Sequence, residues 1–395
     1  MKLSDRIQNV AASPTIAISA KAKEMKASGI DVVSYGAGEP DFDTPDFIKD
    51  AAIEALRAGD TKYGPQKAGE LKKAIADKLA RENGLEIAPS QVIVAFGGKH
   101  ALYSAFQATV DPGDKVLIPA PYWVSYTEQV KLAGGVPVIL ETSYESGFKI
   151  TPEQIREHGK DASILVLNSP SNPTGVMYSK EELAAIAEAV LEFDNLSVFS
   201  DEIYEKLLYS DKEFVSFAAL DSKLPERTLT FNGLSKTFSM TGWRLGWVAG
   251  PQDVISSIDK LLSQATTNPV SFAQAGALAA YVDPSSDQEV EKIRVQFAER
   301  GKHMHKRLND LPGVRCHEPE GAFYCFPDIS ANYGRELGGI NVTDSMSFAQ
   351  AALDSKHVAL VPGLAFGEDS CVRLSFATSM EQIDKGLDRL AELLG

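Results

Sequence analysis

Apolar residues in the middle of the chain recur in two ways, as short strand-like runs and as helical stripes. The strand-like runs occupy 92–95, 115–118, 163–167, 196–199, 228–231 and 245–249. Between several of these runs the spacing becomes helical, and Ser179 with Glu182 three residues later predicts a capped helix start. This alternation favours an α/β fold with a mainly parallel sheet and helices on both of its faces.

The first sixty residues predict two helices and one strand. We expect a helix from a Ser13-Pro14 cap to Gly29, a strand over 31–35 and a helix from a Thr44-Pro45 cap to Gly59. The turn over residues 36–42 contains two glycines, Gly36 and Gly38, which permit a ligand to approach the backbone closely.

The regular alternation ends near residues 282–287, and a long charged amphipathic helix follows to about Leu311. Short apolar runs at 321–326, 358–361 and 372–376 and a final helix after Ser379 complete the chain. We therefore expect a large domain over 46–285 and a smaller α+β domain made of 1–45 and 286–395.

Composition and charge exclude several kinds of partner. The chain has 395 residues and a formal net charge of −15, which argues against nucleic acid or an anionic membrane. Its three cysteines, Cys316, Cys325 and Cys371, are scattered without metal-ligand spacing and fit a reducing compartment. There is no apolar signal core at the start and no run of membrane-spanning length. We expect a cytoplasmic protein.

The stretch 233–247 contains one lysine, Lys236, and one arginine, Arg244, among small, hydroxyl and aromatic residues. Strand-like runs on both sides place Lys236 at the rim of the sheet, where α/β proteins bind ligands. An isolated lysine is more often a solvated surface residue. We interpret Lys236 as a covalent anchor for a cofactor, with surface exposure as the alternative.

The sequence Gly97-Gly98-Lys99-His100 follows a strand and begins a helix. Free N–H groups at a helix start bind phosphate well. This is no Walker loop, because the first glycine of that spacing would fall on Ile93 and no Ser or Thr follows the lysine. An ordinary Gly-Gly turn is the alternative interpretation.

Four further side chains have a chemical and a structural interpretation each. Asn172 offers an amide to a ligand or belongs to an Asn-Pro turn. Asp201, with Tyr204 after it, ends a buried strand and either faces a ligand or caps the next helix. Arg373 either binds a carboxylate or is solvent-exposed, and Trp123 either stacks on a ligand or fills the core.

Together these residues describe one ligand. An imine-forming lysine, an aspartate for a protonated ring nitrogen, a phosphate cradle, an aromatic platform and a carboxylate-binding arginine suit pyridoxal 5′-phosphate with an amino acid. The chain resembles the fold-type I, class I aminotransferases, and among them the bacterial subgroup of aspartate aminotransferases. The motifs of that family stand at Gly38 to Phe42, Tyr122 to Tyr126, Asn172 to Gly175, Ser200 to Tyr204 and Met240 to Arg244.

The resemblance implies a seven-stranded, mainly parallel sheet and a role for each motif residue. Lys236 would form the Schiff base and act with Asp201 and Tyr204 in catalysis. The cofactor would be held by Lys236, Gly98, Lys99, Trp123, Asn172, Asp201, Tyr204 and Arg244, with Tyr63 reaching in from a neighbouring subunit of a homodimer. The substrate would be bound by Gly38, Trp123, Asn172 and Arg373.

The resemblance also implies ping-pong transfer of an amino group from an L-amino acid, aspartate above all, to a 2-oxo acid such as 2-oxoglutarate. The chain departs from some relatives in having no arginine in 263–269 and no lysine in 11–15. Thr15 and Lys99 stay as candidate distal contacts, while Phe323 and Tyr324 could wall the pocket for aromatic substrates. Alternatives are an aromatic or broad-specificity aminotransferase, a pyridoxal-phosphate-dependent carbon–sulfur lyase and, least favoured, a non-enzymatic sensor.

Overall fold

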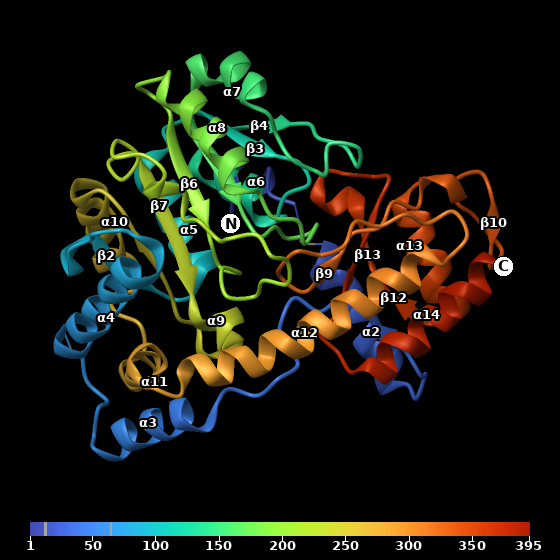
Figure 1. Cartoon of the computed structure of the whole chain (residues 1–395), viewed down its shortest axis with the longest axis horizontal. Helices are drawn as coiled ribbons and strands as arrows, with labels where there is room; N and C mark the ends of the chain where they lie inside the picture. The colour runs from blue at the N-terminus through green and yellow to red at the C-terminus, as the bar shows by residue number, and fades with distance from the viewer. Residues whose placement is uncertain (12–13, 64) are drawn as a thin grey trace.

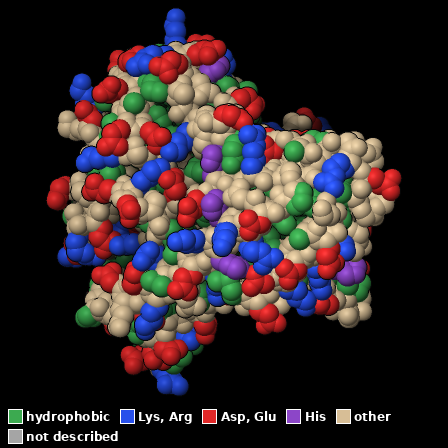
Figure 2. Space-filling model, turned by 45° about the vertical axis from the view of Figure 1, so that its right-hand side comes forward, with side chains coloured by type: hydrophobic (Ala, Val, Ile, Leu, Met, Phe, Trp, Pro, Cys, Tyr) green, Lys and Arg blue, Asp and Glu red, His purple; other side chains and the backbone are tan. Residues whose placement is uncertain are grey.

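The computed structural model describes residues 1–11, 14–63 and 65–395, and side chains in these ranges except those of 14–17, 19 and 65–67 (Figure 1). Ser13, the expected first helix cap, lies outside the described residues. Acidic and basic side chains are mixed over the face seen in Figure 2. Across the described ranges, no helix is long and apolar enough to cross a membrane.

The centre of the molecule is a seven-stranded sheet in the order β2-β8-β7-β6-β5-β3-β4. Its strands are β2 (Val92–Ala95), β3 (Lys115–Pro119), β4 (Val136–Leu140), β5 (Ala162–Asn168), β6 (Ser197–Asp201), β7 (Thr228–Gly233) and β8 (Gly246–Ala249). β8 runs antiparallel to both of its neighbours, β2 and β7, and all other neighbouring strands in this sheet are parallel. The expected mainly parallel seven-stranded sheet is confirmed.

Helices cover both faces of this sheet because successive strand residues point to opposite sides. On one face, Ile118 shares a core with α5 (Gly98–Thr109), α6 (Ser125–Ala133) and α10 (Gln252–Ala265). On the other, Leu117 packs with α7 (Pro152–His158) and α8 (Lys180–Leu191). A third cluster joins the β2 edge to α3 (Asp46–Arg57), α4 (Pro65–Asn83) and α11 (Ser271–Val282).

Segments from the first and last parts of the chain form a second group of elements, at the right of Figure 1, while the N-terminus itself lies over the large sheet. It contains α2 (Pro14–Ala27), β1 (Val33–Ser34), α12 (Ser286–Asn309), α13 (Ser345–Lys356), α14 (Met380–Leu394), β9 (Tyr324–Cys325), β10 (Glu336–Leu337), β11 (Ile340–Asn341), β12 (Val358–Ala359), β13 (Val361–Pro362) and β14 (Val372–Ser375); a short α1 (Asp5–Gln8) precedes them. Parallel pairing of β1 with β12 ties the N-terminal segment to this group. The exact domain boundaries stay a prediction.

Two local expectations were wrong. The run 358–361 is two short strands, because β12 pairs with β1 whereas β13 pairs with β14. Thr44 does not cap α3: its hydroxyl donates to the carbonyl of Ser239 at 2.8 Å, and Pro45 at the helix start provides no side-chain cap. By contrast, the capping box of Ser179 and Glu182 is confirmed at the start of α8.

Candidate active site

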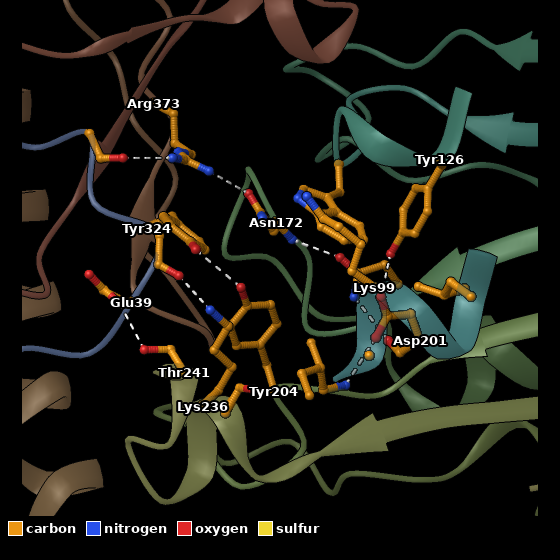
Figure 3. Close-up of a pocket in the computed structure, with 18 of the residues that line it drawn as sticks. Glu39, Lys99, Tyr126, Asn172, Asp201, Tyr204, Lys236, Thr241, Tyr324 and Arg373 are labelled. Atoms are coloured by element: carbon orange, nitrogen blue, oxygen red, sulfur yellow. Dashed lines mark hydrogen bonds between the residues drawn. The ribbon is translucent and has the colours of Figure 1, made fainter. Parts of the chain in front are cut away.

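A cavity of 620 Å³ lies at the carboxyl edge of the parallel strands, next to the elements from the two chain ends. Apart from Tyr63, all the expected site residues line it: Gly38, Gly98, Lys99, Trp123, Asn172, Asp201, Tyr204, Lys236, Arg244 and Arg373. In Figure 3, Arg373 on β14 and Asp201 at the end of β6 lie on opposite sides of the view, with Lys236 at the lower left. The fold thus gathers side chains from distant parts of the sequence.

Tyr63 stands apart from this cavity. Its side chain is 82% exposed, and the cavity wall does not include it. Its expected contact, made to the site of a neighbouring subunit, stays a prediction.

Lys236 lies in α9 (Leu234–Thr237), a single turn that follows β7 directly. The backbone at Gly233 before it leaves no room for a side chain, since a Cβ there would come within 2.8 Å of the Gly246 Cα. The Lys236 ammonium donates a hydrogen bond to the carbonyl of Gly38. Burial lowers the pKa of Lys236 to about 8, with help from the charges of Arg373 and Arg244. At pH 7, about a tenth of Lys236 is therefore the neutral amine, and about half is neutral at pH 8.

This lowered pKa predicts selective labelling. Only neutral amines react with formaldehyde and cyanoborohydride, so at pH 8, in protein freed of any bound cofactor, Lys236 should be methylated at least about tenfold faster than solvated lysines, whose pKa is near 10.4. The rate at Lys236 should rise with pH and level off above about 8. Peptide mass spectrometry over pH 6 to 10 measures both; a rate still rising steeply at pH 10 would contradict the shift.

Asp201 ends β6, and its carboxyl group is buried. The Tyr126 hydroxyl donates to it at 2.6 Å and the Ile203 amide at 3.3 Å (Figure 3). Burial raises the pKa of Asp201 to about 6, while the Tyr126 hydrogen bond, the Ile203 amide and the charge of Lys236 oppose this rise. The carboxylate is consequently mostly ionised at pH 7 and faces the cavity as a fixed negative charge. Sequence reasoning missed Tyr126 as its partner.

The start of α5 forms a cationic cradle. Gly97 precedes this helix with φ +88°, and a Cβ there would come within 2.6 Å of Arg244 Nη2. Glycine is needed both for that backbone conformation and for the approach of the guanidinium. Arg244 is held by the carbonyls of Thr241, at 2.8 Å, and Phe96, at 3.2 Å. The helix start and the guanidinium together suit an anion such as phosphate.

Lys99 adds a second positive charge to this cradle. Its ammonium lies 4.9 Å from the centre of the Trp123 ring. Burial lowers the pKa of Lys99, and the nearby charge of Arg244 lowers it further. Trp123 is itself only partly buried and lines the cavity, so one ring face is placed for stacking beside the cations. Among the described residues, no salt bridge neutralises either cation.

Arg373 is buried, with 3% of its side chain exposed, so the alternative of ordinary solvent exposure is wrong. Its guanidinium donates to Asn172 Oδ1 at 2.9 Å and to the Gly36 carbonyl at 3.2 Å. The rings of Tyr324 and Phe366 lie 4.5 and 4.9 Å from its Cζ. Its Nε has no hydrogen-bond partner in the described part of the chain. A buried guanidinium that has only neutral acceptors and one N–H without a partner is suited to a carboxylate ligand.

Tyr324, Glu39 and Thr241 complete the wall and were missed as polar contacts. The Tyr324 and Tyr204 hydroxyls lie 3.1 Å apart, and Thr241 donates to Glu39 at 2.7 Å. Phe323, in contrast, is fully buried beneath the site and does not line the cavity, which corrects the expectation that it walls the pocket. Within the described ranges, no cluster of His, Cys, Asp or Glu is arranged to hold a metal ion.

Comparisons with known proteins agree with this geometry. The family model described as "Aminotransferase class I and II" matches residues 30–390. The aspartate aminotransferase of Bacillus subtilis (strain 168) is 49% identical, covering 99% of this chain and 98% of its own. The aspartate/prephenate aminotransferase of Cereibacter sphaeroides (strain ATCC 17029 / ATH 2.4.9) is 46% identical, covering 98% and 97%.

Solved structures show the same likeness. The aspartate aminotransferase of Rhizobium meliloti superimposes with a TM-score of 0.95 at 38% identity, over 100% of this chain and 99% of its own. That of Thermus thermophilus with maleate gives 0.93 at 43% identity, over 100% of both chains. The family match over most of the chain and these full-length likenesses place the chain among the class I and II aminotransferases, enzymes that transfer amino groups.

Proposed function

We propose that this aminotransferase uses pyridoxal 5′-phosphate to move the amino group of L-aspartate to a 2-oxo acid such as 2-oxoglutarate by ping-pong chemistry. The observation that carries the proposal is one cavity that is lined together by Lys236, with its lowered pKa, the buried Asp201 carboxyl and the buried Arg373 guanidinium. Relatives named aspartate aminotransferase support the choice of donor.

The residues present fit the cofactor. Its phosphate would be held by the start of α5 at Gly98 together with Lys99 and Arg244, where a glycine-lined cradle and two cations meet. Its ring would lie against Trp123, with its nitrogen toward Asp201 and its phenolic oxygen toward Tyr204 and Asn172. When bound, the cofactor would withdraw electrons from the substrate's Cα–H bond.

The protein's own residues would then handle the proton and the substrate. Lys236 Nζ, as a neutral amine, would accept the proton from the substrate's Cα. Asp201, kept ionised by Tyr126, would hold a proton on the atom facing it. Arg373 would orient the substrate's α-carboxylate, with Asn172 and the backbone at Gly38 beside it.

For the distal carboxylate of a dicarboxylic substrate we propose Lys99, whose side chain would turn inward from the phosphate toward the substrate while Arg244 and the start of α5 keep the phosphate. Its ammonium lines the cavity and has no carboxylate partner among the described residues. A single cation there would favour aspartate and glutamate over neutral amino acids by about 1 kcal/mol or more. The side chain of Thr15, the other candidate, is outside the described part of the structure.

We also propose a homodimer with shared active sites. A second cavity, of 820 Å³, lies beside the first and shares Lys99 and Arg244 with it, and its rim includes the exposed Leu364. The Tyr63 side chain is 82% exposed, which is unusual for a large aromatic residue of a folded protein. In a dimer it would be covered by the partner and would reach the partner's phosphate site. Light scattering should give twice the mass of 42.6 kDa.

A half-reaction screen tests the proposed function. Purified protein should show a visible absorbance that borohydride bleaches, and adding L-aspartate or L-glutamate should remove it fastest among the twenty amino acids. Absence of this absorbance would contradict the proposed use of pyridoxal 5′-phosphate. Faster reaction with aromatic amino acids would support the broad-specificity alternative. Product formed from cystathionine without a 2-oxo acid would support the lyase.

Replacing Arg373 with lysine should lower kcat/KM for aspartate about 10²- to 10³-fold, mainly through a higher KM. Lysine keeps the charge, but it cannot make the paired contacts of a planar guanidinium, each worth about 1.5 to 3 kcal/mol. Steady-state kinetics measures the change. Arg389→Lys, at an ion pair with Asp31 on the surface of α14, is the matched control and should leave both constants unchanged.

Replacing Tyr126 with phenylalanine should lower kcat about twofold at pH 7 and about tenfold near pH 5. Loss of the 2.6 Å hydrogen bond removes a contact that opposes the raised pKa of Asp201. With a higher pKa, a larger fraction of Asp201 is neutral at pH 7, so the acidic limb of the pH–rate profile should move to higher pH by about one unit. An unchanged acidic limb would contradict this role for Tyr126.

A further inference from the structure

The turn that follows β6 separates two cavities. Asp201 and Tyr204 line the active-site cavity, whereas Glu205 lines a smaller cavity of 230 Å³ on the other side. Glu202 and Glu205 are both buried, with 2% and 7% exposure, although neither lines the active-site cavity. Neither is used in the mechanism derived above, which leaves two buried carboxyl groups without a role.

The first of these, Glu202, ties the turn to the segment before η3 (Phe217–Ala219). Its carboxylate accepts a hydrogen bond from Ser216 Oγ at 2.8 and 2.9 Å, one from Ser200 Oγ at 2.9 Å and one from the Phe217 amide at 3.2 Å. All these donors are buried with it. The backbone amide of Glu202 also donates to the Phe231 carbonyl of β7 at 2.9 Å. Residue 202 is therefore fixed from both its side chain and its backbone.

The second, Glu205, ties the end of the turn to α4. It forms an ion pair with Lys78, which is 3% exposed, and accepts a hydrogen bond from Asn83 Nδ2 at 2.9 Å. Lys78 also donates to Asn83 Oδ1 at 2.7 Å, so the three side chains close a ring. Within the turn, the Glu205 amide donates to the Glu202 carbonyl at 3.0 Å. The two anchors thus hold one short segment at both ends.

We propose that Glu202 and Glu205 are positioning residues for the reaction: by anchoring the two ends of the turn on the side away from substrate, they hold Asp201 and Tyr204 at their places in the cavity. This inference rests on the proposed use of pyridoxal phosphate. Desolvated acceptors that are fully hydrogen-bonded hold one geometry, because any displacement leaves a buried donor or charge unpaired. A turn of this kind needs no substrate contact to affect catalysis.

Two single variants and one double variant test the proposal. Ser216→Ala removes the hydroxyl that bonds both Glu202 oxygens, and Glu202→Gln removes the charge with little change of shape. Lys78→Met combined with Glu205→Leu removes both charges of the second anchor, so neither remains buried and unpaired. The control is Ser345→Ala, which deletes another buried hydroxyl bonded to a carboxylate, that of Asp369, far from the turn along the chain.

The readouts are the pH midpoint of the bound cofactor's absorbance, kcat and KM for aspartate, and the thermal unfolding midpoint. We expect each test variant to shift the absorbance midpoint by at least about 0.5 pH unit and to lower kcat about tenfold, with KM within about twofold. The control variant should lower the thermal unfolding midpoint by a similar amount, with no shift of the absorbance midpoint and no loss of kcat. Changes in thermal stability alone, equal in test variants and control, would overturn the inference.

A variant that fails to fold leaves the others to decide, and if all three fail, Glu202→Asp, whose shorter side chain cannot reach all the same donors, replaces them and should shift the midpoint. Ser216→Thr keeps the hydroxyl and should retain the wild-type midpoint, which supports positioning; a midpoint unchanged in every folded variant other than Ser216→Thr overturns it. A wild-type protein without visible absorbance would instead overturn the proposed function, and the inference with it. The two failures are therefore distinguishable.

Discussion

Lys236→Ala should lower kcat for transamination at least about 10⁴-fold and abolish the borohydride-sensitive absorbance of the purified protein. The side chain supplies both the proposed covalent attachment and the proposed general base, and losing a positioned base alone typically costs 10² to 10⁴ in rate. The structure supports this combination, because its amine is partly desolvated and its pKa is lowered to about 8. Single-turnover kinetics with aspartate measures the rate.

Lys260→Ala, on the exposed side of α10, is the matched control and should retain the wild-type rate. Methylamine offers a second test, since a small free amine can replace a missing base in solution. Partial recovery of the Lys236→Ala rate in proportion to the methylamine concentration is expected. A variant that turns over aspartate at the wild-type rate would remove Lys236 from the mechanism.

Asp201→Asn should lower kcat about 10³-fold while the fold stays intact. Asparagine has nearly the same shape: its one amide oxygen can accept from the Ile203 amide, and its NH2 group can donate to the Tyr126 hydroxyl oxygen, so both partners keep a contact. It lacks the charge that would keep a ring nitrogen protonated, and in a buried site one lost charge interaction is worth several kcal/mol. The result is measured as kcat, together with the absorbance of the bound cofactor.

The control for this change is Asp194→Asn, a fully exposed aspartate that precedes β6. It should alter neither the rate nor the absorbance. Equal kcat for Asp201→Asn and the wild type between pH 7 and 8, where the carboxylate is mostly ionised, would contradict the electrostatic role. At pH 5, below its pKa of about 6, the wild-type carboxyl is mostly protonated and the difference between the two proteins should shrink.

Charge in the cavity is divided in a way that suits a dianionic substrate. Arg373 lies toward one end and Lys99 and Arg244 lie by the start of α5, while Asp201 and Glu39 are the carboxylates of the wall. An amino acid with two carboxylates could reach a cation at each of its ends. With the distal role proposed for Lys99, an aspartate-type donor would fit although 263–269 contains no arginine.

Many elements of the fold were predictable because their signals are local. The six predicted strand runs and the capping box at Ser179 depend on spacings of two to four residues, and they reappear as β2, β3, β5, β6, β7, β8 and α8. The edge strand β4 was not among the predicted runs. The run 358–361 failed as one strand because pairing partners, which the pattern does not contain, divide it between two sheets.

The candidate site was predictable as a set of residues and unpredictable as a set of contacts. Lys236, Asp201 and Arg373 stand in recognisable motifs, and all three line one cavity. Tyr126 belongs to such a motif as well, but its bond to Asp201 spans 75 residues of sequence and has no local signature. Phe323 and Tyr324 are neighbours in the chain and their rings lie 4.6 Å apart, yet only Tyr324 lines the cavity, because the Phe323 ring stacks on Phe297 in the buried core.

The sequence by itself determined the class of fold, the family resemblance and the chemical types gathered at the site, since these depend on residue identity and short spacing. Only the tertiary structure decided which groups are buried and which meet. Arg373 and Asn172 are 201 residues apart and bond at 2.9 Å, and burial shifts the pKa of Lys236 down and that of Asp201 up. Desolvation and long-range contact arise from packing of the whole chain, and no local pattern contains them.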